Sequence, residues 1–405
     1  MQIRPSRVRE MSEQLSFILL LCSTLLTLIK IPKINIGVHN ILLPFISLLI
    51  IGLRINVMRE VFARYRSAII FMGLLYLWMW ISAFQSEFQN TAIKYSIKYA
   101  YYFMLFTALL FLTYKNKNNI GFDRLIILFL LLLSMFGIVE EFYPEISIFH
   151  LIRPFGSYMP RVSSLMQNPN PFGSLMSLGV IYSILLRKDE TINGAEFTIS
   201  IILFIICAFL SGSRNAVFVL LMGFIFLAAH QELKFTKRAL KWLIPIAVAL
   251  VFCIFFLSIY YGDQVNYLAS HYLHGEGSRR ILIWKRALYE IVHHPISGIG
   301  IEVFSKHIGI EISGTDIYHT HNILLNILVE LGIVGLILSL LFVYNLLKGL
   351  NFKDAKIAVP ITMILVSQIF DYYSHDVTYA AISLYFLALA ANSKNEHFQK
   401  PYLAT

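Results

Sequence analysis

Long apolar runs are the feature that most limits what this chain can fold into. Apolar stretches recur along the sequence and are separated by short polar breaks. A helix needs about 20 such residues to cross the hydrocarbon core of a bilayer. Hydrophobic residues make up 58% of the chain and charged residues only 14%, against about 25% charged in soluble domains. The sequence therefore excludes a set of soluble domains and predicts an all-α polytopic membrane protein.

The runs predict about twelve transmembrane helices. They begin near Leu15, Val38, Ala68, Ala92, Asp123, Pro171, Phe197, Arg214, Trp242, Asn322, Lys356 and Tyr379. This pattern places spans one to nine in residues 1–261 and a large loop in residues 262–321. Spans ten to twelve and a short tail follow in residues 322–405.

The distribution of Lys and Arg predicts which side of the membrane each loop faces, because cytoplasmic loops carry an excess of these residues. With the N-terminus placed inside, every inner connection is basic and the inner segments hold 21 of the 33 Lys and Arg residues. We therefore expect both termini in the cytoplasm and the loop 262–321 in the periplasm. The same bias explains the net charge of +10 better than binding to nucleic acid does.

The cysteines and the N-terminal segment each predict a feature that the protein lacks. Cys22, Cys207 and Cys253 all lie inside apolar runs, so neither a disulfide framework nor a thiolate metal site is predicted. The first apolar run has no small-residue cleavage site behind it, so we expect no cleavable signal peptide.

The large loop contains one segment with a helical pattern. Ser278 is a suitable N-cap for a helix over residues 279–294, and Pro295 would stop it. The segment carries an apolar stripe at helical spacing, formed by Trp284, Ala287 or Leu288, and Ile291. We expect this helix to lie against the membrane face of the bundle, and packing alone explains the stripe.

Five arginines fall on the predicted outer side and need an explanation: Arg153, Arg161, Arg214, Arg279 and Arg280. Arg214 lies in a very short link between two apolar runs. Arg280 lies in the first turn of the predicted loop helix, where free backbone N–H groups favour an anion. Snorkelling toward lipid phosphates would explain a single arginine. Arg161, Arg214 and Arg280 on one face instead predict a diphosphate site, because guanidinium groups pair with phosphate oxygens.

A second polar group, His319, His321 and Asn322, stands where the loop meets the tenth run. A histidine there could be a polar anchor or a general base, since imidazole titrates near neutral pH. His-x-His can also bind a metal, but no carboxylate cluster or cysteine set accompanies it in the sequence. We therefore predict no metal.

Other charged residues and glycines leave alternatives open. Lys94 and Lys98 share one face of the fourth run and could assist an anion, although snorkelling explains them too. Glu330 and Asp371 are acids inside or at the edge of runs, and either could hold an arginine in place. The glycines after Pro295 predict a turn rather than a phosphate loop.

These motifs resemble those of the O-antigen ligase family, in the same order and over roughly residues 160–340. His321-Asn322, nine residues and Gly332-Ile-Val-Gly335 are similar to the ligase signature. Three further stretches look like those of the wider ligase and polymerase superfamily: Arg161 with Asn168-Pro-Asn170, Ser211-Gly-Ser-Arg214-Asn-Ala216, and Arg280-Ile-Leu-Ile-Trp284 followed by Pro295-Ile-Ser-Gly298-Ile-Gly300.

The resemblance implies a C-type membrane glycosyltransferase fold with a periplasmic helical loop, acting at the periplasmic face of the inner membrane without metal or another cofactor. The implied donor is a glycan on undecaprenyl diphosphate, and the acceptor is a sugar hydroxyl of lipid A–core. His321 would be the base, and the three arginines would hold the diphosphate. The catalytic residues expected are His321, Arg214 and Arg280; the substrate-binding residues expected are Arg161, Asn170, His319, Asn322 and Lys98. We expect His321 to be more rigidly placed than His319.

Two other functions fit the same sequence. A polymerase of O-antigen or capsular polysaccharide would use the same chemistry with a polyprenyl-linked glycan as the acceptor. A flippase for lipid-linked glycans would use the outer arginines as part of a path, and should carry charged residues through the bilayer centre. Here the polar residues gather on one side, which favours an enzyme.

Overall fold

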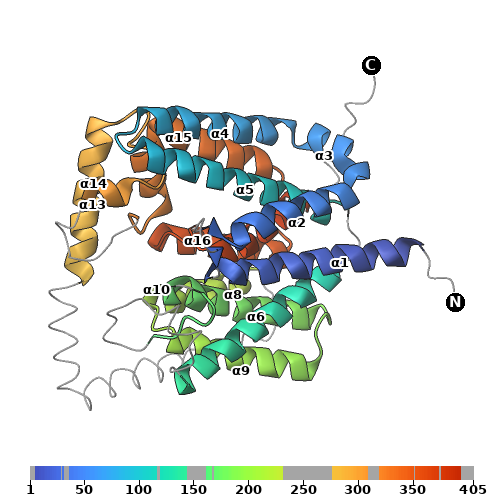
Figure 1. Ribbon diagram of the computed structural model, residues 1–405. Helices are drawn as coiled ribbons and strands as arrows, with labels where there is room; N and C mark the ends of the chain where they lie inside the picture. Colours follow the sequence, from blue (N-terminus) through green and yellow to red (C-terminus); the bar gives the residue numbers. More distant parts are fainter. Residues whose placement is uncertain are drawn as a thin grey trace, which may run out of the picture.

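In the computed structural model the chain forms a bundle of helices (Figure 1). The structure describes residues 5–28, 30–31, 36–115, 119–143, 161–166, 168–230, 276–308, 319–350, 352–373 and 375–393. Within these ranges the helices are α1 (Pro5–Thr24), η1 (Leu25–Leu28), α2 (His39–Leu53), η2 (Ile55–Val57), α3 (Met58–Arg64), α4 (Arg66–Gln85), α5 (Gln89–Thr113), α6 (Asn119–Phe142), α8 (Pro169–Lys188), α9 (Gly194–Leu210), α10 (Arg214–Ala229), α13 (Glu276–His293), α14 (Phe304–Ile308), α15 (Ile323–Leu347), α16 (Ala355–Phe370) and α17 (Val377–Asn392). Two short strands, β1 (Lys30–Ile31) and β2 (Ile36–Gly37), pair in an antiparallel manner.

The helices agree with the predicted apolar runs in position but not all in length. Every run coincides with a helix except the one near Trp242, which lies outside the described residues. Five helices are long and apolar enough to cross a membrane, and a sixth span results if the bent pair formed by α2 with the segment Ile55–Arg64 counts as one. The four helices α9, α10, α16 and α17 are apolar but have only 16 or 17 residues.

A helix of 16 residues is about 24 Å long, which is less than the roughly 30 Å of a hydrocarbon core. The predicted helical chain with several helices able to cross a membrane is therefore confirmed. The predicted number of twelve spans is not, because several apolar runs end early in caps and turns.

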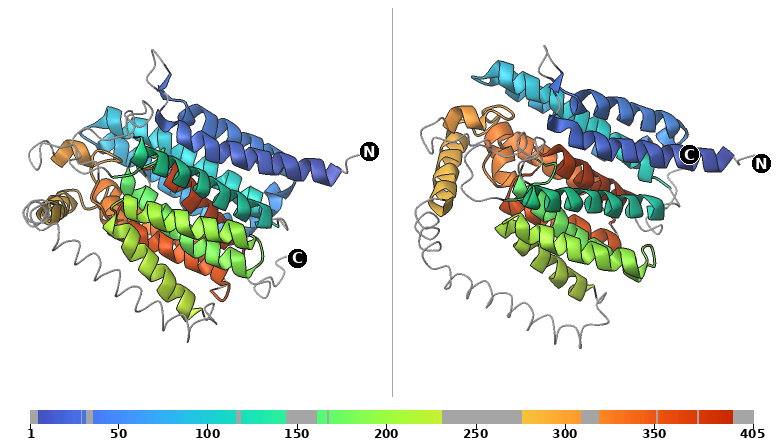
Figure 2. Two further views of the ribbon diagram at one scale, coloured as in Figure 1. Left: turned by 90° about the horizontal axis from the view of Figure 1, so that it is seen from below. Right: turned by 60° about the horizontal axis from the view of Figure 1, so that its bottom comes forward.

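The helices pack into a continuous bundle. On one side α2 and α4 pack on α5, and α15 packs on α4; on the other side α8 packs on α9, α10 and α16. Helix α17 contacts α5, α8 and α16 and so joins the two sides, and Figure 2 shows the long helices running side by side.

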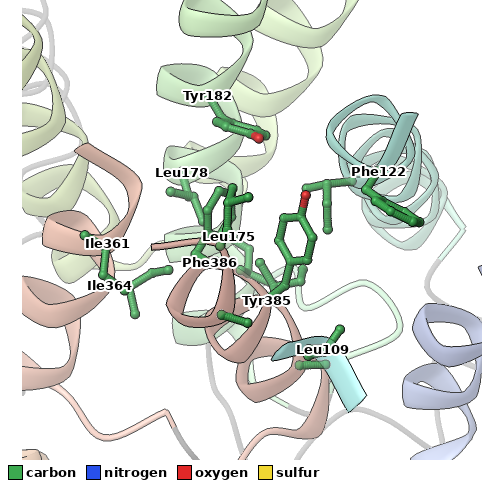
Figure 3. Packing of buried hydrophobic residues seen from close by; sticks show 14 of the residues in the cluster. Leu109, Phe122, Leu175, Leu178, Tyr182, Ile361, Ile364, Tyr385 and Phe386 are labelled. Carbon is green, nitrogen blue, oxygen red and sulfur yellow. The ribbon is translucent and has the colours of Figure 1, made fainter. Parts of the chain in front are cut away.

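Helix α8 lies deepest in the bundle. Its residues from Pro171 to Ser183 are all buried, as expected for a helix that is apolar on every face. Figure 3 shows Tyr182 of α8 with Tyr385 and Phe386 of α17 in this core. Both tyrosine hydroxyls donate to the carboxylate of Asp123, at 2.5 and 3.0 Å. The buried polar groups are thus paired, which the burial of a carboxylate requires.

Helix α15 contains a backbone break that shapes the end of the bundle. At Gly332 the backbone has φ 64° and ψ −169°. The freed carbonyl groups of Val329 and Glu330 accept hydrogen bonds from the backbone N–H groups of Ile299 and Gly300, both at 3.0 Å. A Cβ atom on Gly332 would lie 2.1 Å from the carbonyl oxygen of Ile296. The predicted turn is therefore present, and its backbone completes the broken helix instead of binding phosphate.

Helix α13 crosses the end of the bundle and packs on α15 (Figure 1). It begins at Glu276, so the predicted N-cap role of Ser278 is wrong and Arg280 lies in the second turn. An acidic residue suits the first turn of a helix, which allows the helix to start earlier than predicted. The predicted apolar stripe is confirmed in part: Ala287 is buried and Ile291 packs partly buried against the same cluster, whereas Trp284 is exposed and Ile283 is buried instead.

Candidate functional site

The candidate site surrounds the carboxylate of Asp371, at the end of the bundle that α13 crosses. Asp371 is the C-cap of α16 and is only 2% exposed. Its Oδ1 atom accepts a hydrogen bond from the Tyr372 N–H at 2.9 Å and lies 2.7 Å from His321 Nδ1. Its Oδ2 atom accepts from Asn170 Nδ2 at 3.2 Å and lies 3.8 Å from an Arg280 nitrogen. One carboxylate thus has a histidine on one oxygen and an arginine on the other.

The contact with Asp371 prepares His321 to act as a base. Burial raises the pKa of the Asp371 carboxyl, but the hydrogen bond and charge of His321 and the charge of Arg280 outweigh it and lower the pKa overall. An ionised carboxylate is an acceptor, so Nδ1 of His321 carries a proton, and in the neutral imidazole the lone pair lies on Nε2. The side chain is 28% exposed, which leaves it accessible to a substrate hydroxyl.

The segment that carries His321 is held from three sides. Asn322 caps α15: its Oδ1 accepts from the Leu325 N–H and its Nδ2 donates to the Ile369 carbonyl, both at 2.9 Å. The Trp284 indole N–H donates to the Thr320 carbonyl at 2.9 Å and so ties α13 to this segment. The side-chain amide of Asn322, which the sequence assigned to substrate, is therefore engaged within the protein.

His319 is the more enclosed of the two histidines. It is 7% exposed, and its ring centroid lies 4.6 Å from that of His321 and 4.6 Å from that of His375. Burial lowers the pKa of His319 well below its ordinary value, and nearby His375, His321 and Arg280 lower it further. Residues of the turn that follows α16 pack against its ring, and the expectation that His319 is less rigidly placed than His321 stays a prediction.

Of the three expected arginines, Arg280 faces the Asp371 carboxylate directly and Arg161 is linked to it through Asn170. Arg280 donates to the Phe370 carbonyl at 3.3 Å and faces Oδ2 of Asp371. Arg161 donates from Nε to the Ser211 carbonyl at 2.9 Å and from its terminal nitrogen to Asn170 Oδ1. Since the Asn170 amide also donates to Asp371, it connects Arg161 to the same carboxylate. Arg161 and Arg280 are therefore brought together by residues far apart in sequence.

Arg214 lies in the link that Arg161 contacts. It is the first residue of α10, after the N-cap Ser213, and its side chain is exposed. Gly212 in the same link approaches Arg161 so closely that a Cβ atom there would lie 3.3 Å from its Nε. Arg214 thus lies at the start of a helix, two residues after the glycine that approaches Arg161.

Glu140 is a positioning residue that sequence reasoning missed. Its carboxylate is fully buried and accepts the backbone N–H groups of Ser163 and Ser164 at 2.8 and 2.7 Å. These residues lie two and three positions after Arg161, so the carboxylate fixes the segment that presents the guanidinium. An acid near the end of the fifth apolar run was the only signal for it in the sequence.

Of the two acids left open by the sequence, the structure pairs Asp371 with an arginine. Glu330 lies at the break in α15 and makes no ion pair with arginine within the described residues. Lys98 lies away from the arginines: the opposite charges that act on it most strongly are Glu302 and Asp376. Lys94, one turn earlier, is exposed.

The site also contains a set of atoms that could hold a metal ion. Ligand atoms of His319, His321 and Asp371 all lie within 4.8 Å of one another. The sequence argument against a metal relied on the lack of a neighbouring carboxylate, and that reasoning is wrong because the fold supplies one. The guanidinium of Arg280 beside the same carboxylate opposes a second cation there.

Fold and site together define a multi-pass membrane protein with a histidine–carboxylate pair beside a group of arginines. A family model described as O-antigen ligase matches residues 199–340, from α9 to the middle of α15. This match over residues 199–340 confirms the resemblance to the O-antigen ligase family seen in the motifs.

The chain is also similar to a ComP-specific O-oligosaccharyltransferase of Acinetobacter baylyi. The two are 25% identical over 202 residues, which is 47% of this chain and 36% of the relative. The similar part thus spans about a third of that relative's length.

Proposed function

We propose that this protein is an O-antigen ligase that transfers a polysaccharide from undecaprenyl diphosphate to a sugar hydroxyl of lipid A–core. The observation that carries the proposal is the Asp371 carboxylate, with His321 at 2.7 Å on one oxygen and Arg280 at 3.8 Å on the other. This arrangement supplies a base and an anion-binding group side by side, which displacement of a diphosphate by a hydroxyl requires.

In the proposed reaction the acceptor hydroxyl gives its proton to Nε2 of His321 as its oxygen attacks the anomeric carbon of the donor. A bond forms between that oxygen and the anomeric carbon, and the bond from the carbon to the diphosphate oxygen breaks. The diphosphate leaves with the electron pair, and Arg161, Arg214 and Arg280 stabilise its charge. Direct displacement inverts the anomeric configuration. Because arginines supply the positive charge, the proposed reaction needs no metal ion.

Replacing Arg214 or Arg280 with lysine is expected to lower transfer at least tenfold, since a lysine cannot make the paired contact that a guanidinium makes with phosphate. The measurement is the initial rate of transfer from a polyprenyl-diphosphate donor by purified protein. Arg286→Lys on α13 is the matched control, because Arg286 contacts Glu290 and His307 instead of the site. Full activity in both lysine variants at normal protein levels would favour the alternative, in which these arginines only snorkel toward lipid phosphates.

We further propose that the protein lies in the bacterial inner membrane with its site on the periplasmic face and both termini in the cytoplasm. Lys and Arg residues are concentrated on the predicted inner side, which supports this orientation. Reporter fusions at Gly275 and at the C-terminus should give opposite signals, periplasmic and cytoplasmic. A cytoplasmic signal at Gly275 would contradict both the topology and the proposed reaction.

Two acceptors other than lipid A–core use the same chemistry. A polymerase would extend a polyprenyl-linked glycan, and the similarity to an O-oligosaccharyltransferase favours a protein hydroxyl as a further candidate. The test is the glycoconjugate profile of a deletion strain. Unsubstituted core with accumulated long polyprenyl-linked glycan is expected of a ligase. Core that bears a single repeat unit would indicate a polymerase, and loss of a protein-linked glycan with normal lipopolysaccharide would indicate a protein acceptor.

A further inference from the structure

Three buried polar atoms without hydrogen-bond partners lie on the histidine side of Asp371. Within the described residues, Nδ1 of His319, Nδ1 of His375 and the hydroxyl of Tyr102 make no hydrogen bond. Buried polar atoms in folded proteins nearly always have a partner, so each such atom calls for an explanation. Three of them in one region suggest a polar ligand.

Ring contacts and one hydrogen bond connect the three residues. The ring centroid of His319 lies 4.6 Å from that of His375 and 5.4 Å from that of Tyr372. The Tyr372 hydroxyl lies 2.8 Å from the Tyr99 hydroxyl, and the rings of Tyr99 and Tyr102 are 5.6 Å apart. The region thus brings together α5, the segment before α15 and the turn before α17.

The chemistry of this region suits an uncharged sugar better than a second phosphate. The Tyr99 hydroxyl donates to Glu302 at 3.2 Å, and Lys98 is balanced by Glu302 and Asp376. Aromatic rings that accompany a few polar groups are typical of small-molecule sites. An imidazole ring offers two nitrogen atoms for hydrogen bonds, so His319 and His375 can exchange hydrogen bonds with hydroxyl groups.

Asp371 separates this region from the arginines. Its Oδ2 atom faces Arg280 and Asn170, and its Oδ1 atom faces His321 and, at 3.9 Å, His319. In a direct displacement the nucleophile enters opposite the leaving group. If the arginines hold the diphosphate, the acceptor must approach from the histidine side.

We propose that Tyr102, His319 and His375 bind a hydroxyl-rich, uncharged sugar of the acceptor, one sugar hydroxyl to each unpartnered atom. This subsite rests on the proposed function for its assignment to the acceptor. It lies beside His321 and would place the attacking hydroxyl within reach of the base.

The decisive variant is Tyr102→Phe, which removes a hydroxyl without an internal partner and keeps the ring. The assay measures binding of lipid A–core lacking O-antigen to the full-length protein in detergent, without donor, together with the thermal midpoint. We expect about 3- to 10-fold weaker binding, as for one lost hydrogen bond, and no fall in the midpoint. His375→Leu should also weaken binding. Tyr182→Phe is the control: it loses the bond to Asp123 and should lower the midpoint while affinity stays within twofold.

Unchanged acceptor affinity in Tyr102→Phe and His375→Leu would overturn the subsite. It would also be overturned if these variants bound the donor more weakly but the acceptor as well as wild type does. The same assay with a polyprenyl-linked single repeat unit covers the other glycan acceptor, and failure of the wild type to bind either probe also overturns the subsite. If binding responds to the variants as expected but the wild type shows no transfer, the subsite stands and the proposed reaction fails.

Discussion

Replacing His321 with alanine is expected to lower glycan transfer by about 100- to 10,000-fold, the usual cost of losing a general base. The expectation follows from the hydrogen bond between His321 Nδ1 and Asp371 Oδ1, 2.7 Å long, which leaves the lone pair on Nε2. No other histidine of the described site has both this contact and an accessible ring, since His319 is 7% exposed. Without His321 the acceptor hydroxyl must attack with its proton in place.

The measurement is transfer from a polyprenyl-diphosphate donor to purified acceptor in detergent, with a chelator present to remove metal ions. His319→Ala should keep measurable activity. His293→Ala is a second control, because this exposed residue of α13 contacts Tyr289 rather than the site. A His321→Ala enzyme within a few-fold of wild type would refute the base assignment and leave stabilisation of the leaving group as the main effect. Loss of wild-type activity in chelator would show that the His319, His321 and Asp371 set does hold a metal.

Replacing Asp371 with asparagine is expected to cost a factor on the order of 100 to 10,000 in transfer. The carboxylate accepts the proton of His321 Nδ1, whereas an amide nitrogen in the same place would donate to Nδ1 and move the imidazole proton to Nε2. The base would then hold a proton where it needs a lone pair, an effect known to be large in histidine–carboxylate pairs. The substitution also removes the negative charge that faces Arg280.

The same transfer assay tests this prediction, with the thermal midpoint as a check on folding. Glu330→Gln is the matched control: it makes the same kind of acid-to-amide change at a buried residue nearby that has no arginine partner within the described residues, so it should keep most activity. If Asp371→Asn folds normally and retains transfer within tenfold of wild type, Asp371 does not set the tautomer of His321.

The sequence alone determined the features that depend on local pattern. Apolar runs of a given length predict helices because a backbone in an apolar environment must satisfy its own hydrogen bonds, and every predicted run within the described residues is a helix. The glycines after Pro295 form the predicted turn, because a proline followed by glycines favours a turn in most surroundings. The arginines and histidines stood out because charge is costly in a membrane protein.

The tertiary structure decided which of these residues meet. His321 and Asp371 are 50 residues apart, and Asn170 and Asp371 are 201 apart, so no local pattern could pair them or choose Asp371 over Glu330. The fit of Gly332 against the Ile296 carbonyl and the burial of His319 likewise depend on neighbours that are distant in the sequence. Hydrophobic periodicity fixes which face of a helix is apolar, but the packing of distant helices fixes which polar groups share one buried carboxylate.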